Sequence, residues 1–273
     1  MIKPLISIVT ISYNQKQFLR KTIESVLVQK TADVEYIIVD AGSHDGSLEL
    51  IAEYGARIDH VISGPDQGPA DGLNKGFTKA SGAVGYFLNS DDFLMPHGLH
   101  VMRQFWTQPQ TSNVLLCGAW MVDQRGLPLR ELTPSAQNVR TLLNGAGQMV
   151  QQGMSFKLDV FRKIGGFNMQ NRSCWDLELL CGFLRGDAEA ALLPHRIGAF
   201  RLHGESFTGG AAGAKHVARY RADIARLQHE FNVESLQHSR LLRNLKSPQK
   251  LVDLLLPSRM AKRFATDCEI NES

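Results

Sequence analysis

The N-terminal third of the chain alternates between short apolar runs and longer amphipathic stretches. The apolar runs are rich in β-branched residues, as buried strands are, whereas the amphipathic stretches repeat apolar residues at helical spacing. This alternation predicts an α/β fold with a mostly parallel central sheet, flanked by right-handed crossover helices. The predicted strands are residues 5–11, 36–39, 60–62 and 84–88, and the predicted helices are residues 18–28, 47–54 and 70–80.

Acidic residues follow two of these predicted strands. Asp40 ends the second strand, and the pair Asp91 and Asp92 comes just after the fourth. In open parallel sheets, ligands bind beyond the carboxyl ends of the strands, so we expect these carboxylates to share one edge. Adjacent carboxylates in such a place suit a divalent cation with oxygen ligands. The alternative at 89–92 is a plain turn in which Ser or Asp caps a helix.

The second half of the chain is less regular. It predicts strands at 114–121 and 197–202, helices or strand–helix pieces at 155–164 and 177–184, and a helix at 216–231. Residues 204–213 are rich in Gly and predict a flexible loop, which we expect to close over a bound diphosphate. We therefore expect a catalytic domain over residues 1–214 and a helical, basic extension over residues 215–273.

Composition removes several classes of protein. Hydrophobic residues make up 43% and charged residues 21% of the 273 residues, which suffices for a full core without covalent staples. The four cysteines form no C-x-x-C pair, which disfavours a zinc ribbon or thioredoxin-type site and favours a reducing compartment. No apolar run approaches the ~20 residues of a membrane span. These features predict a cytoplasmic location.

A basic segment lies near the C-terminus. Residues 240–263 hold seven basic residues and one acidic residue, a net charge of +6 in a chain whose net charge is +3. Leucines alternate with the basic residues, so the segment fits an anionic membrane surface, here the inner face of the membrane. A helical extension packed on the domain or on another subunit explains it equally well. Nucleic acid is disfavoured, because only Phe264 is available for stacking on bases.

Four segments together carry a family resemblance. The chain lacks both a Gly-Lys phosphate loop and a G-x-G-x-x-G fingerprint, which disfavours P-loop and dinucleotide-binding folds. Taken together, the four segments resemble the inverting family 2 glycosyltransferases, which adopt the A-type glycosyltransferase fold. The resemblance spans about residues 5–205, and its motifs lie at 7–14, 39–47, 68–76 and 85–96.

This resemblance implies a site for a nucleotide-sugar donor with Mg²⁺ or Mn²⁺. It places Tyr13 in a stack on the nucleobase and Asp40 in contact with the base, and Asn89 stands where the family usually has the first Asp of its D-x-D motif. Asp91 matches the metal-binding acid of that motif, with Asp92 and His203 alongside. The donor-binding positions that the resemblance implies are Thr10, Tyr13, Asp40, Asp66, Asn89 and Ser90.

The same resemblance implies a catalytic base at Asp176, because an inverting transfer needs a carboxylate to take the acceptor hydroxyl's proton. Trp175 replaces the Glu that the family usually has there. The alternatives are that Asp176 only caps a helix and that Glu178 is the base. The implied reaction moves a hexosyl or N-acetylhexosaminyl group from a nucleotide sugar, most commonly a UDP-sugar, to a saccharide or lipid-linked saccharide of a cell-surface polysaccharide.

Two other functions compete with this prediction. A nucleotide-sugar-binding protein without turnover is favoured by the departures at Asn89 and Trp175. A nucleotidyltransferase shares a similar α/β core, but it would need a Gly-rich, basic phosphate loop after the first strand. The segment at 12–15 is neither Gly-rich nor strongly basic.

Overall fold

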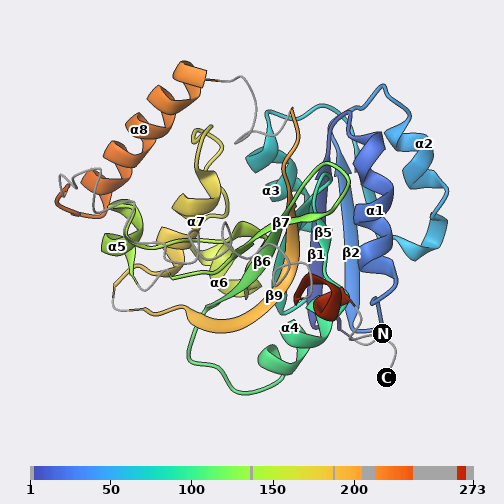
Figure 1. Cartoon of the computed structure of the whole chain (residues 1–273), viewed down its shortest axis with the longest axis horizontal. Coiled ribbons are helices and arrows are strands. Elements are labelled where there is room, and N and C mark those ends of the chain that lie inside the picture. Colours follow the sequence, from blue (N-terminus) through green and yellow to red (C-terminus); the bar gives the residue numbers. More distant parts are fainter. Residues whose placement is uncertain (1–2, 136–137, 187, 205–212, 236–262, 269–273) are drawn as a thin grey trace.

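The structure is a computed structural model that describes residues 3–135, 138–186, 188–204, 213–235 and 263–268 (Figure 1). Residues 205–212 of the predicted Gly-rich loop and residues 240–262 of the basic segment lie outside these ranges. The described residues form one sheet with helices on both of its faces.

The N-terminal half builds the parallel part of this sheet, as predicted. Four neighbouring strands run in the order β3-β2-β1-β4, and all three pairings are parallel. The register aligns Ser12 with Asp40 and Ile11 with Asn89, so the carboxyl ends of these strands meet at one edge. The elements are β1 (Ile6–Ser12), α1 (Lys16–Leu27), β2 (Val34–Asp40), α2 (Ser47–Ala52), η1 (Gly55–Arg57), β3 (His60–Ser63), α3 (Pro69–Lys79) and β4 (Val84–Asn89).

Alternating strand residues divide the core between the two faces of the sheet. Val9 and Phe87 pack in the cluster that includes α3, whereas Ile8 and Tyr36 pack in the cluster that includes α1. Gly76 of α3 lies so close to the sheet that a Cβ there would stand 2.3 Å from Cγ1 of Val9. Glycines recur every four residues from 64 to 76 in the sequence, and at Gly76 this is explained by tight packing of the helix on the sheet.

The second half continues the sheet with mixed directions. The order runs on as β4-β8-β6-β9-β5, where β8 is antiparallel to both of its neighbours and β6 is parallel to β9. Residues 155–164 form a strand end followed by a helix, in agreement with the prediction. The elements are β5 (Phe93–Leu94), α4 (Gly98–Trp106), β6 (Val114–Val122), β7 (Pro128–Leu132), α5 (Val139–Leu143), η2 (Gln151–Gly153), β8 (Met154–Lys157), α6 (Leu158–Lys163), α7 (Trp175–Phe183), β9 (Ala191–Arg201) and α8 (Gly213–Glu230).

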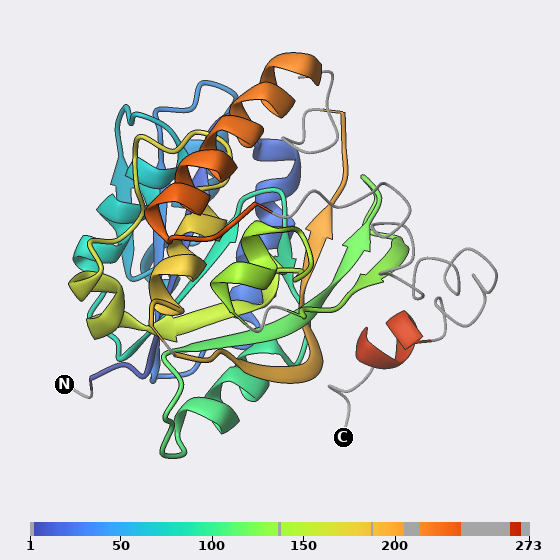
Figure 2. The same ribbon diagram turned by 90° about the vertical axis from the view of Figure 1, so that its left-hand side faces the viewer.

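The described parts of the C-terminal region pack on the domain. Leu227 of α8 is fully buried in the same core cluster as α7, and α8 lies across α7 and α5 (Figure 2). A short helix at 263–268 rests on β6, where Phe264 meets the ring of Trp120 edge-on at 5.4 Å and Asp267 accepts a 2.8 Å hydrogen bond from Trp120 Nε1. No helix within the described ranges combines the length and apolar character needed to cross a bilayer.

Candidate functional site

A cleft of about 510 Å³ lies at the carboxyl end of β4. Asn89 and Asp91 reach it from the end of that strand, Pro69 from the start of α3, and Asp176 from the start of α7. Two of the residues predicted to act on opposite sides of the reaction, Asp91 and Asp176, thus line one cavity. This is the edge of the sheet at which the sequence predicts a ligand.

Asp91 and His203 form a pair beside this cleft. His203 follows β9, and its Nε2 lies 3.1 Å from Oδ2 of Asp91. The imidazole is buried and its ring centre is 4.6 Å from that of Phe18. Arg201 fixes the loop by donating from Nε to the Asp91 carbonyl at 2.7 Å.

This pair fits a divalent cation that also binds its substrate. The carboxylate is a suitable first ligand for Mn²⁺ or Mg²⁺, which keep further positions for phosphate oxygens and waters, whereas the imidazole suits the transition metal Mn²⁺ better than Mg²⁺. Among the described residues there is no group of three or more His, Cys, Asp or Glu side chains that could hold a metal ion. Within the described ranges, Asp91 and His203 leave most positions of a divalent cation open, and a donor diphosphate could fill them.

Asp92 is placed differently from Asp91. It is fully buried, and its two carboxylate oxygens accept hydrogen bonds from Gln152 Nε2 at 2.8 Å and from the Arg201 backbone at 2.9 Å. Burial, together with the neighbouring charge of Asp91, raises its pKa well above the ordinary value. These contacts favour a role in holding the loop that carries Asp91 over direct contact with a metal.

The loops after β1 and β2 are joined to each other next to an exposed aromatic ring. Tyr13 is 58% exposed, as a residue that stacks on a base would need to be. The Asn14 backbone donates to Ser43 Oγ at 2.8 Å, and the Asn14 side chain accepts from the His44 backbone at 2.8 Å. A base stacked on Tyr13 would therefore lie against a pre-formed pair of loops.

Thr10 and Asp40 are both fully buried beneath these loops. Thr10 Oγ1 accepts a 3.2 Å hydrogen bond from the Tyr36 hydroxyl. The Asp40 carboxylate accepts from the backbones of Gly42 and Ser43 at 3.0 and 2.7 Å, and from Ser43 Oγ at 2.7 Å. The structure does not bring either side chain to an open surface, so their contact with a nucleobase stays a prediction.

The remaining predicted donor positions, Asp66, Asn89 and Ser90, each make a hydrogen bond to another part of the protein. Asp66 Oδ1 accepts from the Gly68 backbone at 2.8 Å, just before α3. Asn89 lines the cleft and donates from Nδ2 to Gln151 Oε1 at 3.2 Å. Ser90 is buried, and its carbonyl accepts a 2.7 Å hydrogen bond from Thr22 Oγ1. Only Asn89 of these three lines the cleft.

Asp176 lies in the first turn of α7 and lines the cleft. The capping position of this helix belongs to Cys174, so Asp176 is not the capping residue. Its Oδ1 accepts a 2.8 Å hydrogen bond from the Leu177 backbone. Burial nevertheless raises its pKa, which makes the ionised carboxylate a stronger base than an exposed Asp.

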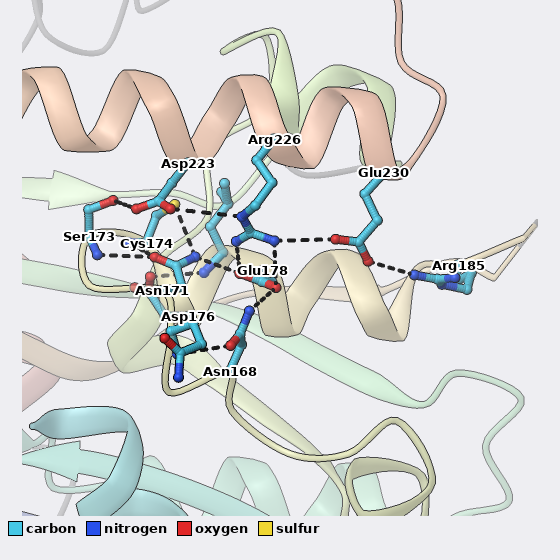
Figure 3. A network of polar contacts seen from close by, with 12 residues as sticks. Asn168, Asn171, Ser173, Cys174, Asp176, Glu178, Arg185, Asp223, Arg226 and Glu230 are labelled. Atoms are coloured by element: carbon cyan, nitrogen blue, oxygen red, sulfur yellow. Dashed lines mark hydrogen bonds and ion pairs between the residues drawn. The ribbon is translucent and has the colours of Figure 1, made fainter. Parts of the chain in front are cut away.

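Glu178, the substitute candidate for the base, is turned toward α8 (Figure 3). Its carboxylate accepts hydrogen bonds from Arg226, from Asn168 at 2.8 Å and from Asn171 at 2.6 Å. Burial alone would raise its pKa, but these hydrogen bonds, that of Arg226 foremost, lower it below the ordinary value. A carboxylate with a lowered pKa and three donors is a poor proton acceptor, which leaves Asp176 as the better candidate.

The contacts of Glu178 belong to a larger set that we call the α8 network: Asn168, Asn171, Ser173, Glu178, Asp223 and Arg226. Asp223 of α8 accepts a hydrogen bond from Ser173 Oγ, and Asn171 Oδ1 accepts from the backbones of Ser173 and Cys174 at 3.0 and 2.9 Å (Figure 3). The network thus ties α8 to the loop that leads into α7 and Asp176.

The cleft also contains residues that the sequence did not single out. Arg172 lines it opposite the start of α3 and donates to the Gln67 carbonyl. Arg130 reaches it from β7, a strand that was not predicted. Trp175 lines it too, with its ring centre 5.8 Å from that of Phe87 and 5.3 Å from that of Phe167. The unusual Trp at 175 was the only one of these three with a signal in the sequence.

Comparison with solved structures confirms the predicted fold. Staphylococcus aureus TarS in complex with UDP-GlcNAc superposes with a TM-score of 0.66 over 93% of this chain and 73% of that one, at 16% identity. A Pyrobaculum calidifontis mannosyltransferase in complex with GDP-Man and Mn²⁺ gives a TM-score of 0.59 over 98% of this chain and 74% of that one, at 14% identity. The chain has the A-type glycosyltransferase fold.

Sequence relatives lead to the same family. An uncharacterized glycosyltransferase of Haemophilus influenzae is 37% identical over 53% of this chain and 59% of its own length. A Bacillus subtilis protein named as a teichuronic acid biosynthesis glycosyltransferase is 33% identical over 46% of this chain and 51% of its own length. The chain thus matches only a little over half the length of these relatives. The sequence profile of Glycosyl transferase family 2 matches residues 7–175, so this chain belongs to glycosyl transferase family 2.

Proposed function

We propose that this protein transfers a hexosyl or N-acetylhexosaminyl group, with inversion, from a UDP-sugar to a hydroxyl of a saccharide or lipid-linked saccharide in surface polysaccharide synthesis. One observation carries the proposal: Asp176, a half-buried carboxylate with a raised pKa, lines the same cleft as Asp91, which is paired with His203. The UDP-GlcNAc in the TarS complex and the name of the Bacillus relative support the choice of donor and pathway.

Asp91 and His203 would hold Mg²⁺ or Mn²⁺ between them. When bound, the ion would neutralise charge on the departing nucleoside diphosphate. Asp92 would keep the Asp91 loop in place through Gln152 and Arg201, as its buried hydrogen bonds suggest. Arg172 would supply a further positive charge at the start of α3.

The donor's nucleoside would lie over the loops after β1 and β2. Tyr13 would stack on the base, and the turn fixed by Asp40 would lie beside it. Thr10 would support this floor from below, together with the Asp66 turn and Ser90. Asn89 would face the sugar-diphosphate from the cleft wall.

Asp176 would act on the acceptor. Its carboxylate would take the proton of the acceptor hydroxyl as that oxygen attacks the anomeric carbon in line with the departing diphosphate. One bond forms between the acceptor oxygen and the anomeric carbon, and the bond from that carbon to the β-phosphate oxygen breaks. UDP leaves with the electron pair, and the configuration at the anomeric carbon is inverted.

The basic segment at 240–263 would hold the enzyme on an anionic membrane surface. Its net charge of +6 and interleaved leucines suit the headgroup region. A lipid-linked acceptor would be presented at that surface, on the inner face of the membrane. The short helix at 263–268, which rests on Trp120, would then connect the segment to the catalytic domain.

Binding and turnover separate this proposal from its alternatives. We expect a UDP-sugar with Mn²⁺ to raise the unfolding midpoint more than GDP- or TDP-sugars do, because a bound ligand stabilises by mass action. The matching UDP-sugar should then be hydrolysed slowly, or transferred when acceptor is present. Stabilisation by the donor without any turnover, with metal and a broad acceptor panel supplied, would instead identify a binding protein.

A further inference from the structure

One wall of the cleft is a small patch of sheet. Met121 of β6 is paired with Arg130 of β7 on one side and with Phe200 of β9 on the other, so these three side chains lie abreast. Leu132 follows two residues after Arg130 and therefore shares its face. All four line the cleft. A guanidinium is thus set in an otherwise apolar wall.

Arg130 forms no ion pair with any carboxylate of the described residues. Its neighbour Glu131, on the opposite face of β7, is engaged by Arg263 at 2.9 Å and lies 4.0 Å from Arg196. Arg130 is half-buried, so part of its hydration is lost, and no carboxylate within the described ranges replaces it. A guanidinium in such a place is a ready receptor for a planar or tetrahedral oxyanion, which it binds through two parallel hydrogen bonds.

Trp175 gives the cleft a second surface on which an acceptor could bind. Its ring is held edge-on or tilted against Phe167 and Phe87, which leaves it a rigid apolar surface in the cleft. A neutral aromatic face at this position suits packing against a sugar ring and adds no negative charge to the cleft.

From this wall we propose that the acceptor saccharide carries an anionic group, either a sugar carboxylate or a phosphate ester, which binds Arg130 while a sugar ring packs on Trp175. This inference rests on the proposed transferase function and names the substrate class of the same cleft. Arg172 also lines the cleft, but it lies beside Gly68 at the start of α3. Since we expect the donor diphosphate there, we do not assign the acceptor's anionic group to Arg172.

The test measures binding of three matched probes to the full chain saturated with UDP and Mn²⁺. The probes are methyl glucoside, methyl glucuronide and methyl glucoside 6-phosphate, and saturation-transfer NMR titration gives their affinities. We expect one or both anionic probes to bind about 10- to 100-fold more tightly than the neutral one, the worth of a charge-assisted hydrogen-bonded pair. Whether the carboxylate or the phosphate binds more tightly identifies the source of the anion.

Three variants make the result specific to Arg130. Arg130→Gln should reduce the preference for the anionic probes to about one, and Arg130→Lys should keep part of it, because Lys keeps the charge but loses the fork. Arg125→Gln, on the exposed turn of the same hairpin and outside the cleft, should leave the preference unchanged. UDP affinity should stay equal in all variants, which shows that they are folded.

Equal binding of neutral and anionic probes to the unmodified protein overturns the inference, as does failure of both anionic probes to bind. A preference that survives in Arg130→Gln overturns it as well. A protein that does not bind UDP with Mn²⁺ at all contradicts the proposed transferase function itself, and is detected before any acceptor probe is added.

Discussion

The proposed donor side and the proposed acceptor side of the site are built by different means. On the donor side, regular parallel strands end in short loops whose positions are fixed by hydrogen bonds between neighbouring loops, such as that from the Asn14 backbone to Ser43. On the acceptor side, the loop before α7 has few regular elements around it and is tied by side chains to α8, about fifty residues further along the chain. The proposed donor side is thus fixed by its own strands, whereas the proposed acceptor side is fixed by a helix that is distant in the sequence.

The largest effect should come from the donor side. Asp91→Ala should lower metal-dependent transfer by about 10³-fold or more, because the ion would lose its carboxylate ligand. UDP binding measured by calorimetry should become equal with Mn²⁺ and with EDTA. Asp159→Ala, which removes an exposed carboxylate of α6 paired with Lys163, is the matched control and should change neither quantity. Full activity of the Asp91 variant, with EDTA still inhibiting the unmodified enzyme, would place the metal elsewhere.

On the acceptor side, Asp176→Asn should lower kcat by about 10²–10⁴-fold, the usual contribution of a general base. The UDP-sugar dissociation constant should stay within about twofold, because the amide keeps the shape of the side chain. A collapse of donor affinity would mean that Asp176 is a donor ligand and that the two halves are not separate in function.

The pH profile of kcat/KM tests the same carboxylate. Burial raises the pKa of Asp176, and a base is active only when it is ionised. Activity should therefore fall as the pH drops through a value above the ~3.9 of an exposed Asp, and the residual activity of Asp176→Asn should lack that acid limb. For stability the sign is opposite: a raised carboxyl pKa favours the folded state at low pH, and this contribution fades as the pH rises through it.

A smaller effect is expected from the α8 network. Arg226→Ala should lower kcat about tenfold by loosening the loop that positions Asp176, with little change in donor affinity. It should also lower the free energy of unfolding by about 1–2 kcal/mol, since Glu178 is mostly buried and loses its charged partner while Arg226 itself is partly exposed.

Two comparisons separate positioning from plain destabilisation in this experiment. Arg185→Ala breaks the more exposed pair with Glu230 and a cation–π contact 4.7 Å from the Phe231 ring centre, at the far end of the same helices, and should cost about 0.5–1 kcal/mol without changing kcat. In the double variant Arg226→Ala with Glu178→Gln, the kcat loss should be less than the product of the single losses. If kcat instead falls in proportion to the free energy of unfolding across all these variants, Arg226 does not position Asp176.

The smallest expected effect lies outside the cleft. Changing Arg240, Arg243, Lys246 and Lys250 to Gln in the full chain should weaken flotation with anionic liposomes while leaving kcat on a water-soluble acceptor unchanged. Neutralisation is preferable to truncation, because truncation also removes the helix at 263–268 and uncovers Trp120. Unchanged flotation would leave the segment as a packed extension.

The two halves also differ in how far they could be predicted. The alternation of apolar residues predicts the four parallel strands to within a few residues of their observed ends. The motifs that follow β1 and β4 then place Tyr13 and Asp91 at the edge of the sheet. β7 was missed, because its five residues alternate too weakly to indicate a strand, and Arg130 was missed with it. The burial of Thr10 beside the Tyr36 hydroxyl could not be predicted, because it depends on which face of β1 the helices cover. The engagement of Glu178 by Arg226 joins positions 48 residues apart, which no local pattern can indicate.

The α8 network also limits how this chain can be recombined with its relatives. The family profile ends at residue 175, yet the side chains that position its last segment come from 213–230. A chimera cut near residue 180 would join a foreign helix to the native loop and leave Ser173 and Glu178 facing unmatched partners. Exchanges that move residues 168–178 together with 213–230 preserve both sides of each contact, so these two stretches form one transferable unit for engineering acceptor specificity.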